Sequence, residues 1–180
     1  MIFENLIGLK EIKDTKKLIN RIAIRAIIFK DDKLLMISNN KGDIKFPGGG
    51  LELDENHEEA VRREVQEETG YIVSDVEQLI GTVIERRKDK FDEDCIFEMK
   101  SYYYSCKVLD EKTEQSLDDY EAKLEYEPRW VELKEAIRIN NNIIKMHERN
   151  PWVDRELFVL NQLNNKYEWR VKHGKYYSKY

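Results

Sequence analysis

The sequence contains few cysteines, and their spacing excludes a cysteine-based metal site. Cys95 and Cys106 are the two cysteines among 180 residues, and they match no metal-binding spacing. We interpret them as isolated thiols that are buried or half-buried. Free thiols of this kind suit a reducing compartment, so we expect cytoplasmic localisation.

The sequence also lacks long apolar runs, repeats and linkers. Charged residues interrupt the N-terminal segment: Glu4, Lys10, Glu11 and Asp14. We therefore expect neither a secretory signal nor a membrane span there. No internal repeat occurs, and no stretch is rich in proline, glycine or serine. We therefore predict one domain, 1–180, with a core at about 20–148 and a C-terminal helix and tail at 150–180.

Neither sign of charge dominates the composition. The formal net charge is −5, with 41% hydrophobic and 37% charged residues. These values are typical of a soluble, polar globular protein rather than a disordered one. The modest negative charge also argues against general binding to nucleic acid or to an anionic membrane. We expect no membrane association and no stable nucleic-acid partner.

The hydrophobic pattern predicts a mixed α/β domain. Residues 22–29 are almost continuously apolar, as in a strand that is covered on both faces. Further strands are expected at 34–37, 44–46, 71–87, 95–109 and 129–133, and helices at 134–148 and 152–164. Residues 110–125 are acidic and suggest a surface loop, and residues 86–90 suggest a charged turn. Strands flanked by helices on both faces predict a three-layer sandwich.

The most informative feature is a cluster of three carboxylates on one predicted helix. At about 100° per residue, Glu64, Glu67 and Glu68 fall on one arc. Like charges three or four residues apart destabilise a solvated helix by about 0.2–0.5 kcal/mol per pair, and no lysine lies between residues 45 and 88 to pair with them. We therefore expect a cation against this arc. Ligands that are all oxygen point to Mg²⁺ or Mn²⁺, shared with substrate phosphates.

Local signals bound this helix and precede it with a loop. Asp54 or Asn56 can cap its start, and Gly70 stands where a helix stops. Upstream, residues 46–47 end a strand and lead into three consecutive glycines at 48–50. Glycines permit a close approach of the backbone to a ligand. A strand, a glycine loop and an acidic helix in series form a plausible site for phosphate and metal.

The residues from Gly49 to Tyr71 resemble the signature of the Nudix hydrolases. The matching positions are Gly49, Glu55, Arg63, Glu64, Val65, Glu67, Glu68 and Gly70. Two positions depart from the signature: Leu53-Asp54 stands where many members have Pro-Gly, and Tyr71 stands where a small aliphatic residue is commoner. The resemblance implies a Nudix-type α/β/α sandwich with a mixed sheet, to which this chain adds a C-terminal helix and tail.

The resemblance also implies roles for these residues. It implies Mg²⁺, with Mn²⁺ as a possible substitute, held by Glu64, Glu67, Glu68 and the backbone carbonyl near Gly48. By the same resemblance, Glu55 and Arg63 orient the glutamates, with Gly49 in support. Glu52 is either a further supporting residue or plain loop surface.

The implied reaction is attack of water on phosphorus in a P–O–P linkage. The substrate would be a nucleoside diphosphate linked to another group: a nucleoside triphosphate, a dinucleotide or a nucleotide sugar. A carboxylate must accept the proton. We favour Glu64 or Glu67 for this role and count them with Arg63 as the catalytic group. The alternatives, Glu125 and Glu127, lie in the loop before the last predicted strand.

Other interpretations stay open. The same scaffold could sense a nucleotide without hydrolysing it, although such a site would be expected to lose one or more of the glutamates. The acidic helix could instead recruit a basic protein partner. A proline-bearing patch soon after the signature, which we associate with hydrolases of ADP-ribose, is not evident, because Pro128 is the first proline downstream. That branch is therefore disfavoured.

Weaker features have simpler explanations. The tyrosines at 102–104 could stack on a base, but alternation along a strand explains them equally well. Four basic residues could clamp phosphate, although solvated strand or turn positions are the default. They are Arg25, Lys45, Arg86 and Arg87. The basic, aromatic tail at 166–180 could touch RNA or a nucleotide, but we expect a terminal hairpin around Gly174 or a surface that packs on a second subunit of a homodimer.

Overall fold

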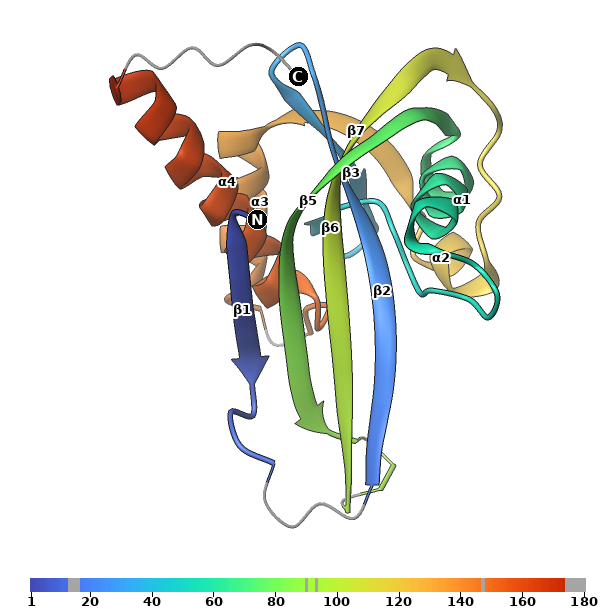
Figure 1. Cartoon of the computed structure of the whole chain (residues 1–180), viewed down its shortest axis with the longest axis vertical. Helices are drawn as coiled ribbons and strands as arrows, with labels where there is room; N and C mark the ends of the chain where they lie inside the picture. Colours follow the sequence, from blue (N-terminus) through green and yellow to red (C-terminus); the bar gives the residue numbers. More distant parts are fainter. Residues whose placement is uncertain (13–16, 90, 93, 147, 174–180) are drawn as a thin grey trace.

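A mixed β-sheet lies between two layers of helices, as a computed structural model shows (Figure 1). The structure describes residues 1–12, 17–89, 91–92, 94–146 and 148–173, and side chains up to residue 166. Within these residues the strands are β1 (Phe3–Gly8), β2 (Lys17–Lys30), β3 (Lys33–Ser38), β4 (Ile44–Lys45), β5 (Tyr71–Lys88), β6 (Cys95–Lys112) and β7 (Glu127–Glu132). The helices are α1 (His57–Thr69), α2 (Asp119–Lys123), α3 (Leu133–Ile143) and α4 (Val153–His173). Helices α1 and α2 lie on one side of the sheet and α3 and α4 on the other, which confirms the α/β/α sandwich.

The sheet combines parallel and antiparallel pairing. Its strand order is β1-β5-β6-β2-β3-β4, and β7 pairs with β3. Strands β5 and β6 form a long antiparallel hairpin, whereas β2 runs parallel to β6 and β1 runs parallel to β5. The prediction of a mixed sheet is therefore confirmed. The lower ends of β2, β5 and β6 extend beyond the helices (Figure 1).

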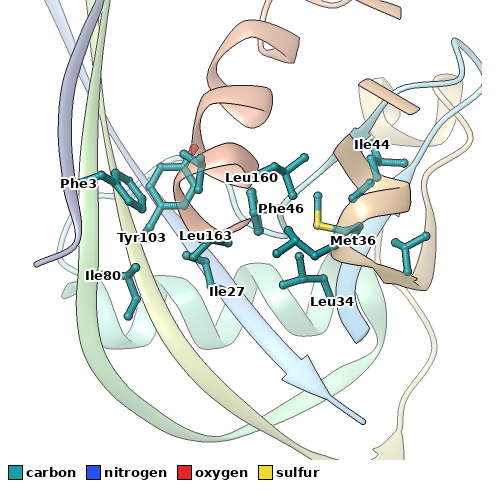
Figure 2. Packing of buried hydrophobic residues seen from close by; sticks show 14 of the residues in the cluster. Phe3, Ile27, Leu34, Met36, Ile44, Phe46, Ile80, Tyr103, Leu160 and Leu163 are labelled. Atoms are coloured by element: carbon teal, nitrogen blue, oxygen red, sulfur yellow. The ribbon is translucent and has the colours of Figure 1, made fainter. Parts of the chain in front are cut away.

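Two apolar cores cover the two faces of the sheet. One core lies towards α3 and α4 and includes Phe3, Ile27, Phe46, Tyr103 and Leu160 (Figure 2). The other lies under α1 and includes Ile24, Ile28, Val61 and Val65. Ile24 and Ile27 belong to different cores because successive side chains of a strand point to opposite faces. Both faces of β2 are covered at residues 23–28, which explains most of the apolar run, whereas Ile22 and Phe29 at its two ends are exposed.

Both ends of α1 are fixed by local hydrogen bonds. Asn56, and not Asp54, is the N-cap: its side chain accepts from the backbone amides of Glu58 and Glu59. Glu59 closes a capping box with the backbone of Asn56. At the other end Gly70 adopts the left-handed conformation, with φ 73°. These two ends fix the direction in which the carboxylates of α1 point.

The surface loop expected at 110–125 is confined to residues 113–118. Strand β6 continues to Lys112, and α2 follows a cap in which Asp118 accepts from two backbone amides. After α2, Leu124 is buried in a third apolar cluster with Ile37. The acidic composition of this segment therefore gave no sign of its buried leucine.

Some expected boundaries also differ from the structure. Strand β5 runs through Lys88, so Arg86, Arg87 and Lys88 of the expected turn belong to the strand. Helix α3 ends at Ile143 rather than near 148, whereas α4 continues through His173 because no proline or glycine interrupts it. The first arm of the expected hairpin is thus helical, and Gly174 lies outside the described residues.

Cys95 and Cys106 are buried free thiols, which confirms the interpretation of the cysteines. Among the helices described, including the long α4, none is sufficiently long and apolar to cross a membrane.

Candidate metal and phosphate site

The glycine loop that follows β4 lies directly against α1. The backbone amide of Gly48 donates a hydrogen bond to Glu68 Oε2 at 2.8 Å. Gly48 has φ 135°, and a β-carbon there would lie 2.1 Å from the carbonyl oxygen of Ile24. Only glycine fits this position without displacing the backbone. The missing side chain thus lets the loop backbone reach the carboxylate.

Strand β2 holds the other side of the glycine loop. The backbone amide of Ile24 donates to the carbonyl oxygen of Gly49 at 2.9 Å. From the same strand, Arg25 Nη1 donates to the carbonyl oxygen of Gly48 at 2.8 Å. The loop is therefore fixed from the sheet as well as from α1.

Three carboxylates converge beside this loop. One oxygen each of Glu64, Glu68 and Glu121 lies within 4.8 Å of the others. Glu68 is fully buried and Glu64 is 8% exposed. Burial raises the pKa of Glu68 to about 7 and also raises the pKa of Glu64. Crowded, buried carboxylates of this kind bind a proton or another cation more readily than exposed ones.

This group of oxygens fits a hard divalent cation. Mg²⁺ binds oxygen at about 2.0–2.1 Å, so ligands on opposite sides of the ion lie roughly 4.2 Å apart. Adjacent ligands lie roughly 3 Å apart, so oxygens within 4.8 Å of one another would have to close in to surround one ion. Oxygen donors also suit Mg²⁺ and Mn²⁺ better than metals that prefer sulfur. Glu64, Glu68 and Glu121, with the carbonyl oxygen of Gly48, are therefore the residues that could hold a metal ion.

Two basic residues of the sheet are buried in the same site. Lys45 Nζ lies 2.5 Å from Glu68 Oε1 and 3.4 Å from the carbonyl oxygen of Gly48. Lys45 and Arg25 are both buried, so the default expectation that they are solvated strand residues is wrong. Lys45 faces the carboxylate of Glu68, and Arg25 faces the carbonyl oxygen of Gly48.

Arg63 ties α1 to the segment that precedes it. Its guanidinium donates to the carboxylate of Glu55 at 2.7 and 3.1 Å, to Glu64 at 2.9 Å and to Glu67 at 3.0 Å. It also donates to the carbonyl oxygen of Gly50 at 3.1 Å. The hydrogen bond between Arg63 and Glu55 lowers the pKa of Glu55 and raises the pKa of Arg63. A planar fork of this kind holds several oxygens in fixed positions.

The other residues expected in the site lie around this group. The side chain of Glu67 is 39% exposed, and Glu67 is not among the three converging carboxylates in the described part of the chain. Glu52 has an exposed side chain, although its backbone amide donates to Glu55 at 2.7 Å. Gly49 lies so close to Glu64 that a β-carbon would be 2.5 Å from its carboxylate.

A cavity of about 330 Å³ lies beside Glu67. It is lined by Arg63, Gln66, Glu67, Thr113, Glu114 and Ser116. Ser116 closes one side, because its backbone amide donates to the carbonyl oxygen of Glu67 at 2.9 Å. The side chain of Glu67 lines this cavity and is 39% exposed, whereas Glu64 and Glu68 are buried.

Glu121 is the residue of the group that sequence analysis missed. It lies on α2 and is half-buried. The spacing Asp118-x-x-Glu121 is a capping-box signal, and the structure contains that box. This signal could have predicted α2, but not its approach to α1. Glu125 and Glu127, the loop candidates, are exposed and are not members of the described carboxylate group.

The tyrosines at 102–104 alternate between the two faces of β6. Tyr103 is buried against Phe3 and Phe46, so it is not free to stack on a base. Tyr104 and Tyr102 lie on the other face, next to α1, where both rings contact His57. Strand alternation therefore accounts for the run of three.

Arg86 and Arg87 lie near the C-terminal end of β5, where both contact residues of β6. Arg86 Nε lies 2.5 Å from Glu98 Oε2, and the guanidinium of Arg87 lies 4.8 Å from the ring centroid of Phe97. Both partners belong to β6, in the hairpin with β5. These contacts explain the two arginines without a phosphate.

The sequence of this chain resembles known proteins. A family model described as the NUDIX domain matches residues 19–155. The chain is 35% identical over 111 residues to Nudix hydrolase 12, mitochondrial, of Arabidopsis thaliana, covering 61% of this chain and 52% of the relative. It is 47% identical over 64 residues to the ADP-ribose pyrophosphatase of Methanocaldococcus jannaschii, covering 33% and 37%. The chain thus spans about half or less of the length of these relatives.

Solved structures resemble the fold. A NUDIX hydrolase from Nitrosomonas europaea superimposes with a TM-score of 0.57 at 23% identity, covering 81% of this chain and 89% of that one. A MutT NUDIX hydrolase from Burkholderia pseudomallei gives a TM-score of 0.53 at 19% identity, covering 80% and 98%. At these identities the likeness concerns the fold alone.

Proposed function

The chain belongs to the NUDIX domain family, and on this premise we propose that it hydrolyses a P–O–P linkage with the help of Mg²⁺ or Mn²⁺. The substrate class is a nucleoside diphosphate linked to another group. One observation carries the proposal: the oxygens of Glu64, Glu68 and Glu121 converge beside the backbone of Gly48. Named hydrolases among the relatives support the same reaction class.

Four groups of this chain would hold the cation: Glu64, Glu68, Glu121 and the carbonyl oxygen of Gly48. When bound, a divalent cation neutralises phosphate charge and lowers the pKa of an attacking water. The protein fixes the ligands from three directions. Arg63 holds Glu64, the Gly48 amide holds Glu68, and the box at the start of α2 holds Glu121. Ligand carboxylates need such partners to keep their orientation.

We assign proton acceptance to Glu67. A general base must reach the water whose proton it takes, and Glu67 is the carboxylate of the signature that is accessible from the cavity. Arg63 holds Glu67 Oε2 at 3.0 Å, which fixes the direction in which Glu67 Oε1 points. Glu125 and Glu127 are weaker candidates because they lie outside the converging group.

ADP-ribose belongs in the first substrate panel. The relative from Methanocaldococcus jannaschii is named an ADP-ribose pyrophosphatase and is 47% identical over the 64 matched residues. Against this stands the missing proline-bearing patch, since Pro128 is the first proline after the signature. Nucleoside triphosphates, dinucleotides and nucleotide sugars complete the panel.

A substrate panel with and without metal tests the proposal. Each compound is incubated with the protein in Mg²⁺, Mn²⁺ or EDTA, and nucleotide products are separated by ion-exchange chromatography. Glu68→Gln should lower turnover by about 10²–10³-fold while the far-UV circular dichroism stays unchanged. Glu58→Gln, at an exposed position of the same helix, is the matched control. A near-normal rate of Glu68→Gln at saturating Mg²⁺ would contradict this assignment.

A nucleotide sensor is the competing function. It predicts nucleotide binding by calorimetry without any product across the panel. Retention of all the signature glutamates argues against it, because a binding module does not need them.

We also retain four further proposals from the sequence. Residues 1–180 form one domain, and the protein works in a reducing, cytoplasmic compartment. It binds no nucleic acid stably, and it can form a homodimer. Size-exclusion chromatography with light scattering tests the last of these directly.

A further inference from the structure

The side chain of Lys45 ends among the groups assigned to the cation. Its ammonium lies 2.5 Å from Glu68 Oε1 and 3.4 Å from the carbonyl oxygen of Gly48. The side chains of Lys45 and Glu68 are 8% and 1% exposed, so water contributes little to the solvation of either charge. One buried ammonium therefore contacts two of the oxygen donors proposed for the metal.

The ring of Tyr126 lies beside the same ammonium. Lys45 Nζ is 4.6 Å from the ring centroid, within the range in which an aromatic face attracts a cation. Tyr126 is itself held, because it packs with Ile37 and Leu124 and its carbonyl oxygen accepts from Gln115. The ring thus offers the ammonium a fixed contact that does not depend on Glu68.

The buried carboxylates need a counter-charge when they are ionised, even without a metal ion. A buried carboxylate that lacks a partner is strongly unfavourable. Arg63 reaches Glu64 at 2.9 Å. For Glu68, the described hydrogen bonds to the carboxylate come from Lys45 and from the uncharged Gly48 amide. Lys45 is therefore the cation that directly neutralises Glu68.

We propose that Lys45 is a built-in counter-cation, which neutralises Glu68 in the metal-free protein and withdraws towards Tyr126 when a divalent cation binds. The inference rests on the proposed metal site. Like charges at shared ligands repel each other, so Lys45 competes with the metal and weakens its binding. The same contact stabilises the metal-free fold. Lys45 thus lowers the affinity for metal and raises the stability of the metal-free protein.

Replacing Lys45 by methionine separates these two effects. Lys45→Met keeps an unbranched apolar chain and removes the charge. At pH 8 we expect Mn²⁺ to bind about tenfold more tightly, measured by electron paramagnetic resonance of free Mn²⁺. In EDTA the melting temperature should fall by about 5 °C, and saturating Mn²⁺ should restore most of this loss. Lys41→Met, at an exposed position, is the matched control and should change neither quantity.

A purely structural ion pair predicts a different result. The loss of melting temperature would then be equal in EDTA and in Mn²⁺, and Mn²⁺ affinity would be unchanged or lower; either outcome overturns the inference. Lys45→Gln keeps a donor for Glu68 and replaces Lys45→Met if that variant does not fold, with the same expected tightening. Absence of Mn²⁺ binding by the wild-type protein would defeat the metal site as well. Binding by the wild type without tightening in the variants would defeat only the role of Lys45.

Discussion

The side-chain amide of Gln115 donates a hydrogen bond to the backbone carbonyl oxygen of Glu68 at 2.6 Å. The same nitrogen donates to the carbonyl oxygen of Tyr126 at 3.1 Å. Glu68 lies in the last turn of α1, where carbonyl groups lack partners within the helix. Gln115 therefore satisfies a free carbonyl of α1 and ties that helix to the segments on both sides of α2, which carries Glu121.

Gln115→Ala should weaken this connection. The change leaves two carbonyl oxygens without their donor, so the free energy of unfolding should fall by about 1–3 kcal/mol. Affinity for Mn²⁺ should fall as well, because α2 loses one of its attachments to α1. Urea denaturation and Mn²⁺ titration measure the two effects. Gln78→Ala, at an exposed position of β5, is the control. Unchanged Mn²⁺ affinity would mean that α2 keeps its position without Gln115.

Glu121→Gln tests the residue that α2 brings to the site. We expect the dissociation constant for Mn²⁺ to rise about tenfold or more, since one of three converging carboxylates becomes neutral. Glu125→Gln and Glu127→Gln are the matched controls, because both residues are exposed and nearby in the sequence. Calorimetric titration of Mn²⁺ compares the three. A larger effect at Glu125 or Glu127 would contradict the assignment of Glu121 as a metal ligand.

The parts of the site that are local in sequence could be predicted. The glycine loop and the carboxylates of α1 lie within residues 46–70, where spacing, capping and the glycines act on neighbouring residues. Asn56 and Gly70 bound the helix through hydrogen bonds that span only a few positions. Local rules of this kind are visible in the sequence without knowledge of the tertiary packing.

The parts that depend on distant packing could not be predicted. Lys45 appears in the sequence as one polar residue between apolar neighbours, and its burial follows from its contacts with Glu68 and Tyr126. Glu121 reaches the site because the segment before α2 bonds to the end of α1. Neither contact has a local signature, so the acidic composition of 110–125 suggested a loop instead.

Arg63→Lys should disturb the carboxylates without removing positive charge. A lysine ammonium cannot reproduce the planar fork that contacts Glu55, Glu64 and Glu67. We expect metal affinity or turnover to fall about 10–100-fold. Arg62→Lys is the matched control, because Arg62 pairs with the exposed Glu58 and with the backbone of Val73 instead of the site carboxylates. Steady-state kinetics at several Mg²⁺ concentrations separate the two quantities. Equal behaviour of both variants would argue against an orienting role for Arg63.

The stability of the metal-free protein should decrease as the pH rises from 5 to 8. Burial raises the pKa of Glu68 to about 7 from its ordinary value of 4.5, so between these values the folded state holds a proton that the unfolded state has lost. The folded state is then favoured at the lower pH, by up to about 3 kcal/mol from this group. Glu64 acts in the same direction, because burial raises its pKa too. The lowered pKa of Glu55 has its effect only at more acidic pH.

Urea denaturation in EDTA at pH 5, 6, 7 and 8 measures this dependence. Glu68→Gln cannot titrate, so its free energy of unfolding should vary less across the same range. Saturating Mn²⁺ should reverse the trend in the wild-type protein, because a metal ion competes with the proton for the same oxygens and binds more tightly as the pH rises. Equal slopes for wild type and Glu68→Gln would mean that Glu68 is already ionised at pH 5. Its contact with Lys45 would then outweigh the effect of burial on its proton.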